Sequence, residues 1–279
     1  MPSPKIVAKI ESEEATHRLA VLIDADNAQA SIIEGLLEEI ARLGEATVKR
    51  IYGDFTSPTS SQWKKVLNKY AIKPVQQFAY TTGKNATDST LIIDAMDLLY
   101  TRRFDGFCLV SSDSDFTGLA LRIREEGLTV FGFGEQKTPE AFKNACHKFV
   151  FTEVLRQSTV TKIESDLNIK NQQVETNISS ASNLKKQESV TECAVQETND
   201  NLPKEFILKA LETTASDDAG WTNLGTFGSY LTKLKPDFDV RLYGFKKLSD
   251  MVRKHTDIFQ IDERSIPNSA AKDLYIRKK

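Results

Sequence analysis

Aspartates stand where apolar runs end, at separate places in the chain. Runs of four or five apolar residues are typical of strands buried on both faces of a sheet. In open α/β sheets, ligands bind beyond the carboxyl ends of such strands. The hydrophobic core does not require aspartates at these positions, so we interpret them as a candidate ligand-binding site. They are Asp24 and Asp26 after the run 19–23, Asp88 at the start of an expected helix, and Asp113 and Asp115 after the run 107–110.

Crowded carboxylates predict a metal ion. At one sheet edge they would repel one another unless a cation neutralised them, and Mg²⁺ or Mn²⁺ prefers oxygen ligands. The three cysteines and three histidines are dispersed, so neither a disulfide framework nor a zinc site is indicated. A divalent cation polarises a phosphoryl oxygen and activates water for in-line displacement. The neighbours expected to orient water or bind phosphate are Asn27, Lys84, Ser111 and Ser112.

Helix capping is the alternative explanation for each aspartate taken singly. An aspartate after a strand often accepts hydrogen bonds from the first N–H groups of the next helix. Asp88 and Asp115, each just ahead of a helix, are the strongest candidates for caps. Asp94 lies about 240° around its helix from Asp88, so we expect it to be solvated or to support the site indirectly.

The elements that would position these acids alternate between strand and helix. Parallel strands need crossover helices, so the alternation predicts a three-layer α/β domain with a parallel sheet. The carboxyl ends of its strands then meet at one edge. The expected strands are 19–23, 46–55, 74–80, 107–110 and 128–133, and the expected helices are 28–43, 61–70, 88–103, one around 119–123 and one from 138 onward.

The rest of the chain differs in character. Residues 1–17 form a tail without the apolar segment of a signal peptide, and no run approaches the ~18–20 apolar residues of a membrane helix; we therefore expect a cytoplasmic protein. Polar residues dominate 157–201, which predicts a flexible linker. Three helices and a hairpin in 202–279 predict a winged-helix α+β domain, with a third helix from about Tyr243 to His255.

Residues 18–156 resemble the NYN domain, a branch of the PIN-like nuclease superfamily that includes the LabA-like proteins. The segments LIDADN, KNATDSTLIIDAMDLL and LVSSDSDFTGLALRIREEGLTVFGFG carry the resemblance, although the family usually has glycine where Ser112 stands. The resemblance implies a metal-dependent ribonuclease. It implies that Asp24, Asp88, Asp113 and Asp115 hold Mg²⁺ or Mn²⁺, with Asn27 as a neighbour.

Residues 202–279 are similar to the OST-HTH (LOTUS) domain. The match rests on the segments DAGW, PDFD and YGFKKL. The resemblance implies RNA as a partner, and other proteins are a further possibility for this domain. The sequence does not indicate an oligomeric state.

The basic residues of this domain agree with an anionic partner. Residues 201–279 carry 14 Lys and Arg against 11 Asp and Glu, and basic side chains on a helix and wing can contact phosphates. A solvated helix face is the alternative. We expect Trp221, Phe238 and Tyr243 to belong to the core. The residues expected to bind RNA are Lys246, Lys247, Arg253, Lys254 and Arg277.

Two other functions compete with the ribonuclease. Asp24-Ala25-Asp26 also fits the strand end of a haloacid-dehalogenase-like phosphatase, in which Asp24 would be the nucleophile. That pattern usually continues to Thr where Ala28 stands, and it has no place for Asp88. The other alternative is a catalytically inert RNA-binding adaptor, which acts through the C-terminal domain alone.

Overall fold

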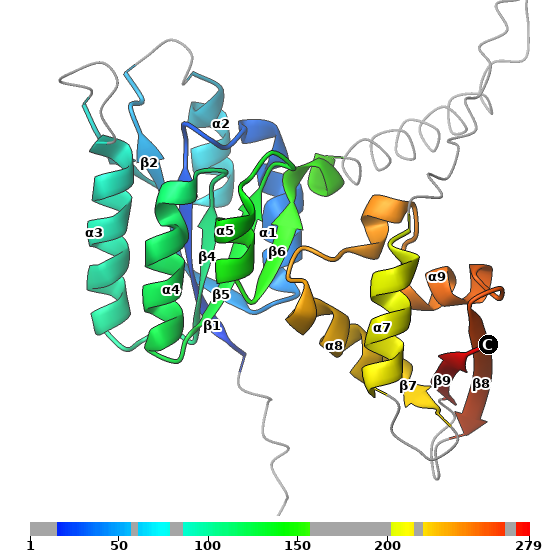
Figure 1. Ribbon diagram of the computed structural model, residues 1–279. Coiled ribbons are helices and arrows are strands. Elements are labelled where there is room, and N and C mark those ends of the chain that lie inside the picture. Colours follow the sequence, from blue (N-terminus) through cyan, green and yellow to red (C-terminus); the bar gives the residue numbers. More distant parts are fainter. Residues whose placement is uncertain (1–15, 57–60, 79–85, 157–201, 215–219, 266–271) are drawn as a thin grey trace, which may run out of the picture. The chain divides into compact units, whose positions relative to one another are not determined.

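The computed structural model describes two groups of elements, which we treat separately as the N-terminal part (16–156) and the C-terminal part (202–279) (Figure 1). No helix among the described residues is both long and apolar enough to cross a membrane. The linker predicted for 157–201 lies outside the described residues, so the domain boundaries stay predictions. The described residues are 16–56, 61–78, 86–156, 202–214, 220–265 and 272–279.

The N-terminal part is built on a six-stranded sheet with the order β3-β2-β1-β4-β5-β6 (Figure 1). β1 pairs in parallel with β2 and β4, and β2 pairs in parallel with β3, which confirms the predicted α/β class. The strand order reverses between β1 and β4, so their carboxyl ends form the switch point at which such sheets bind ligands. The strands are β1 (Arg18–Asp24), β2 (Glu45–Gly53), β3 (Lys73–Gln76), β4 (Gly106–Val110), β5 (Thr129–Gly134) and β6 (Lys148–Phe151).

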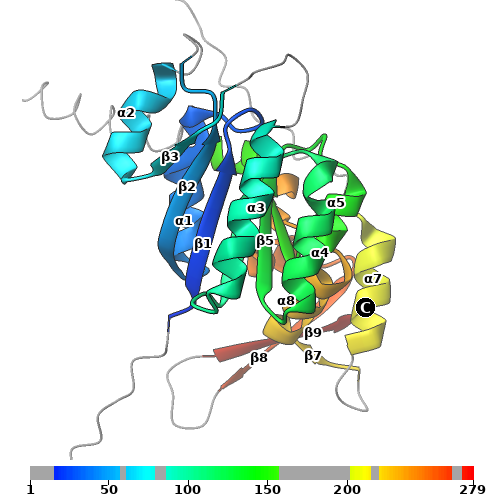
Figure 2. The same ribbon diagram turned by 90° about the vertical axis from the view of Figure 1, so that its left-hand side faces the viewer.

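Helices cover both faces of the sheet. α1 and α2 lie on one face, and α3 and α4 lie on the other (Figure 1, Figure 2). The three-layer arrangement follows from the right-handed crossovers that join parallel strands. The helices are η1 (Ala30–Ile32), α1 (Ile33–Ala41), α2 (Ser61–Tyr70), α3 (Ala86–Tyr100), η3 (Ser114–Phe116), α4 (Thr117–Glu125) and α5 (Glu140–Ala145).

β1 lies in the middle of this core. Its residues from Leu19 to Asp24 are all buried, as a strand enclosed between two helical layers requires. Directly after it, the N–H of Ala25 donates to the carbonyl oxygen of Tyr52 at 2.9 Å. A Cβ added to Gly53 would come within 2.8 Å of the Ala25 Cβ. The close approach fixes the backbone where the first two aspartates stand.

The C-terminal part combines helices with an antiparallel sheet in the order β7-β9-β8. Asn223 begins α8, because its side chain accepts hydrogen bonds from the N–H groups of Gly225 and Thr226. The part has its own buried core, which includes Ile207, Phe227 and Met251. Its elements are α7 (Lys204–Thr214), β7 (Thr222–Asn223), α8 (Leu224–Leu234), η5 (Val240–Tyr243), α9 (Leu248–Lys254), β8 (Phe259–Ser265) and β9 (Lys272–Lys278).

Several elements differ from the sequence prediction. The strand expected at 74–80 ends at Gln76, and β7 adds a third strand to the expected hairpin of the C-terminal part. The sheet of the N-terminal part has a sixth strand, β6, at Lys148–Phe151, where the apolar run is only three residues long, from Phe149 to Phe151. The single helix predicted from Tyr243 to His255 is wrong. There η5 ends at Tyr243, Gly244 takes the left-handed conformation with φ of 81°, and α9 begins only at Leu248. A left-handed residue ends a helix, and glycine adopts it without steric cost.

Candidate functional site

Asp24 ends β1 and lies fully buried at the carboxyl edge of the sheet. Its Oδ2 accepts hydrogen bonds from Asn27 Nδ2 at 2.7 Å and from Ser111 Oγ at 2.8 Å. Its Oδ1 accepts the N–H of Asp26 at 3.0 Å. Burial raises the pKa of Asp24, and the three hydrogen bonds oppose that rise without cancelling it. The carboxylate therefore holds together the loops that follow β1 and β4.

The loop after β4 is ordered by a chain of hydrogen bonds that starts at Asp24. Ser111 Oγ, which donates to Asp24, accepts the N–H of Asp113 at 3.1 Å. Asp113 Oδ1 in turn accepts the N–H of Asp115 at 2.9 Å and thereby caps η3. The cap in this loop is thus made by Asp113, whereas Asp115 lies within the first turn. The other carboxylate oxygen of Asp113, Oδ2, has no part in the cap.

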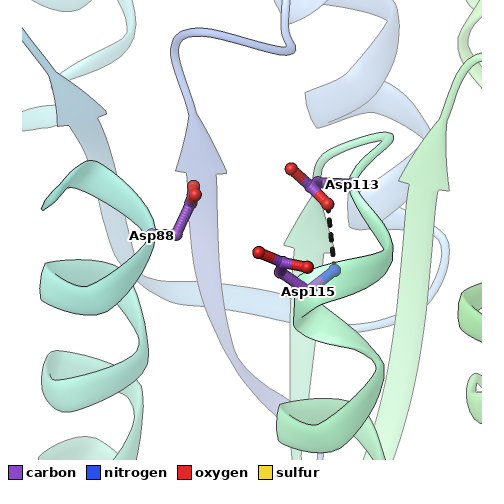
Figure 3. Close-up of side chains that lie close together, drawn as sticks. All are labelled: Asp88, Asp113 and Asp115. Carbon is purple, nitrogen blue, oxygen red and sulfur yellow. Dashed lines mark hydrogen bonds between the residues drawn. The ribbon is translucent and has the colours of Figure 1, made fainter. Parts of the chain in front are cut away.

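Three carboxylates from two elements converge beside this loop. Asp88, in the first turn of α3, points across to Asp113 and Asp115 (Figure 3). One ligand oxygen from each lies within 4.8 Å of the others. Mg²⁺ and Ca²⁺ bind oxygen at roughly 2.0–2.6 Å, so oxygens on one such ion stand no more than about 5 Å apart. The spacing therefore fits one hard divalent cation.

The electrostatics of Asp88 show how much negative charge gathers here. Partial burial and then the charges of Asp24, Asp113, Asp115 and Asp26 raise the pKa of Asp88 to about 6. Each neighbouring carboxylate disfavours the ionised form. A bound cation would reverse this effect and favour ionisation. The donor set thus fits a metal site in charge as well as in spacing.

The other residues predicted for the site have different positions. Asp26 is exposed, and its charge acts on Asp24 and Asp88. Ser112 is buried beside Ser111. Lys84 lies outside the described residues. Asp24 is not one of the three residues whose oxygens converge, so its role as a direct metal ligand stays a prediction.

Asp94 has partners that the sequence did not indicate. Its carboxylate accepts hydrogen bonds from Arg50 Nη1 and from the hydroxyl of Tyr52, both on β2. The Arg50 and Asp94 side chains are each less than a quarter exposed. Burial, followed by the hydrogen bond to Asp94, raises the pKa of Tyr52. The contact fastens α3 to the sheet, which is a supporting role. Because the partners lie more than 40 positions away, no local pattern could have shown it.

Four of the basic residues predicted to bind RNA are exposed on α9 or just before it, whereas the fifth, Arg277, is half-buried on β9. Lys246 and Lys247 are exposed immediately before α9, not on it. Arg253 forms an ion pair with Glu263 at 2.9 Å. Lys254 Nζ lies 5.3 Å from the centre of the Phe245 ring. These positions are compatible with phosphate contacts.

One aromatic residue of this part lies elsewhere than expected. Phe238 and Tyr243 pack against the core of the C-terminal part. Trp221 is not in that core cluster and remains partly exposed. The guanidinium carbon of Arg277 lies 4.7 Å from its ring centre.

Family models now identify both parts. The NYN domain model matches residues 18–155, and the OST-HTH/LOTUS domain model matches residues 201–269. The chain is an NYN domain joined to an OST-HTH/LOTUS domain. The first has the fold of the PIN-like nuclease superfamily, and the second belongs to a class of domains that bind RNA. No curated protein sequence matches the chain.

Several solved structures are similar to parts of the chain. A solution structure of an uncharacterised protein from Nitrosomonas europaea is 53% identical over 34% of this chain and 92% of its own, with a TM-score of 0.28. A protein from Chromobacterium violaceum is 36% identical over 27% of this chain and 77% of its own, with a TM-score of 0.22. A protein of unknown function from Vibrio parahaemolyticus is 19% identical over 50% and 94%, with a TM-score of 0.43.

Proposed function

We propose that this protein is a metal-dependent ribonuclease whose NYN domain hydrolyses phosphodiester bonds of RNA that the OST-HTH/LOTUS domain helps to hold. The observation that carries the proposal is the convergence of oxygens from Asp88, Asp113 and Asp115 within 4.8 Å at the switch point of the sheet. Among the described contacts, capping accounts for Asp113. It does not explain why the carboxylate of a separate helix faces the same point.

The residues would divide the work as follows. Asp88, Asp113 and Asp115 would hold Mg²⁺ or Mn²⁺. The buried Asp24 would support them through its hydrogen bond to Ser111. When bound, such an ion polarises a phosphoryl oxygen and lowers the pKa of a water molecule. Asp24 positions Ser111 and Asn27 through its hydrogen bonds, and it adds to the negative potential at Asp88. Asp26, Asn27, Lys84 and Ser112 are proposed neighbours that orient water or phosphate.

The decisive test compares two aspartates of the N-terminal part. Asp113→Asn removes one charge from the converging group, whereas Asp97→Asn removes one from the exposed side of α3. We expect the first variant to lose cleavage of labelled RNA by at least ~100-fold and the second to cleave normally. EDTA should stop cleavage by the native protein, and added Mn²⁺ or Mg²⁺ should restore it. Asp113 is preferable to Asp24 because a change at Asp24 also disturbs the two loops.

The results also decide between the alternatives. RNA binding that persists in EDTA, with no product in either metal, would replace the ribonuclease by the inert adaptor. Cleavage by Asp113→Asn at the native rate would rule out the proposed centre. The phosphatase gains no support from the geometry, since a nucleophile must reach its substrate and Asp24 is fully buried among three donors.

A further inference from the structure

The sheet of the C-terminal part has one face in the core and one face outside it. On β9, Ile276 is buried and its register partners are Ile261 on β8 and Thr222 on β7. Successive side chains of a strand point to opposite faces. Tyr275 and Arg277 therefore point away from the core.

Two arginines and two aromatic rings alternate on this outer face. The guanidinium carbon of Arg264 lies 4.1 Å from the ring centre of Tyr275 and 5.5 Å from that of Trp221. The guanidinium carbon of Arg277 lies 4.7 Å from the Trp221 ring centre. We call the series Tyr275, Arg264, Trp221 and Arg277 the arginine–aromatic ladder. It draws its members from all three strands or their ends.

Hydrogen bonds orient the guanidinium groups of the ladder. Arg264 Nε donates to Asp262 Oδ2 at 2.9 Å, and Arg277 Nε donates to Gln260 Oε1 at 2.8 Å. Both acceptors lie on β8, two positions apart on the outer face. Planar groups held in this way are preorganised for stacking, so less conformational entropy is lost when a ligand binds.

A pocket adjoins the Arg277 end of the ladder. Its volume is about 440 Å³, within the range of small-molecule sites. Three cationic side chains line it against one carboxylate, that of Glu212, which pairs with Lys278 at 2.7 Å. The pocket thus places positive charge beside the stacking surface. Its lining residues are Leu211, Glu212, Gly220, Gln260, Arg277, Lys278 and Lys279.

We propose that the arginine–aromatic ladder is a binding site for single-stranded RNA, on which bases stack while the pocket takes a backbone phosphate. Aromatic rings and guanidinium planes stack on any base, whereas bases within a duplex are covered by their neighbours. This site is separate from Lys246 and Lys247, which precede α9. The choice of RNA as the ligand rests on the proposed function.

The fluorescence of Trp221 tests this proposal directly. The chain has two tryptophans, and Trp63 is 3% exposed in the N-terminal part, so Trp63→Phe leaves Trp221 as the single reporter. Titration of this full-length variant with a single-stranded uridine decamer in EDTA should quench the fluorescence. An abasic decamer of the same length and a duplex RNA should not. Equal quenching by the abasic strand would refute base stacking on the ladder. Absence of quenching by the uridine decamer would refute RNA binding at this face.

Affinity measurements give a second, independent test. Because stacking on an aromatic side chain contributes substantially per base, Trp221→Ala and Tyr275→Ala should each weaken decamer binding by about 5- to 100-fold. Tyr275→Phe keeps the ring and should bind within about 2-fold of the native protein. Native-like circular dichroism must accompany each variant. Unchanged affinity in both alanine variants would refute the binding site, even if the Asp113→Asn variant supports the nuclease. If the alanine variants lose affinity but the native protein cleaves no RNA, the binding site is supported and the nuclease is refuted.

Discussion

The protonation of Asp88 gives the candidate metal centre a stability effect that can be measured without RNA. Its pKa is about 6 in the metal-free fold, against an ordinary value of 3.8. Between these values the folded chain binds a proton that the unfolded chain lacks, so the metal-free protein loses stability as pH rises from about 4 to 6. Asp88→Asn should therefore raise the melting temperature in EDTA at pH 7.5 by about 1–3 °C and have little effect at pH 4. Asp97→Asn, on the exposed side of the same helix, is the control, and a lower melting temperature for Asp88→Asn would contradict the repulsion.

The affinity for a metal ion should change with pH in the direction opposite to the stability, because protonation of Asp88 weakens metal binding. A ligand carboxylate must be ionised to bind a cation. We therefore expect the affinity for Mn²⁺, measured by calorimetry, to be constant above about pH 7 and to fall by up to about tenfold per pH unit below pH 6. Asp88→Asn should bind weakly at every pH. A native affinity that does not change between pH 5 and pH 7 would exclude Asp88 from the ligands.

Ser111 links Asp24 by hydrogen bonds to Asp113, one of the converging carboxylates. Its hydroxyl donates to Asp24 and accepts the N–H of Asp113, so Ser111→Ala removes one of the three hydrogen bonds to the buried Asp24 carboxylate and takes this acceptor from the half-buried N–H of Asp113. Such a loss costs about 1–3 kcal/mol, and Mn²⁺ affinity should fall by about 10- to 100-fold. Urea unfolding and calorimetry measure the two effects. Ser114→Ala, at the exposed first position of η3, should change neither, and equal effects of the two variants would deny Ser111 a positioning role.

At the scale of elements, the site depends on how α3 is fastened to the sheet. Asp94 receives Arg50 and Tyr52 from β2, less than two helical turns after Asp88. Asp94→Ala would leave Arg50 without this carboxylate in a position less than a quarter exposed. We expect a decrease of about 1–3 kcal/mol in the free energy of unfolding and weaker Mn²⁺ binding. Asp97→Ala should stay within about 0.5 kcal/mol of native, and urea unfolding that cannot distinguish the two variants would show that the pair contributes nothing.

The sequence predicted the elements that carry strong local signals. Buried runs such as 19–23 and 107–110 became β1 and β4, and the acids that follow them lie at one edge because parallel strands share a direction. The contacts of Asp94 could not be foreseen, since they join segments that only the folded sheet brings together. The third helix of the C-terminal part was extended too far because its apolar spacing continues through Gly244. There the backbone conformation, not the side-chain pattern, ends the first helical turn.

At the scale of the whole molecule, we expect changes in the two domains to affect different kinetic constants, kcat for the NYN domain and KM for the OST-HTH/LOTUS domain. The NYN domain contains the three converging carboxylates, and the OST-HTH/LOTUS domain carries exposed lysines that precede α9. If those lysines contact phosphates far from the scissile bond, as we propose, these contacts are the same in the ground state and the transition state. Such uniform binding lowers KM without raising kcat. Removal of the lysines should therefore raise KM and leave kcat unchanged.

The variant that tests this separation is Lys246→Ala with Lys247→Ala in the full chain. Each lost phosphate contact should reduce the salt dependence of binding by roughly one unit of slope, so we expect KM for a long RNA to rise several-fold at low salt and less at high salt. Lys209→Ala with Lys233→Ala removes the same charge from exposed positions of α7 and α8 and serves as the matched control. If both pairs raise KM equally, the effect belongs to net charge alone. If the first pair lowers kcat instead, the C-terminal domain acts on the chemical step and the two domains are not independent.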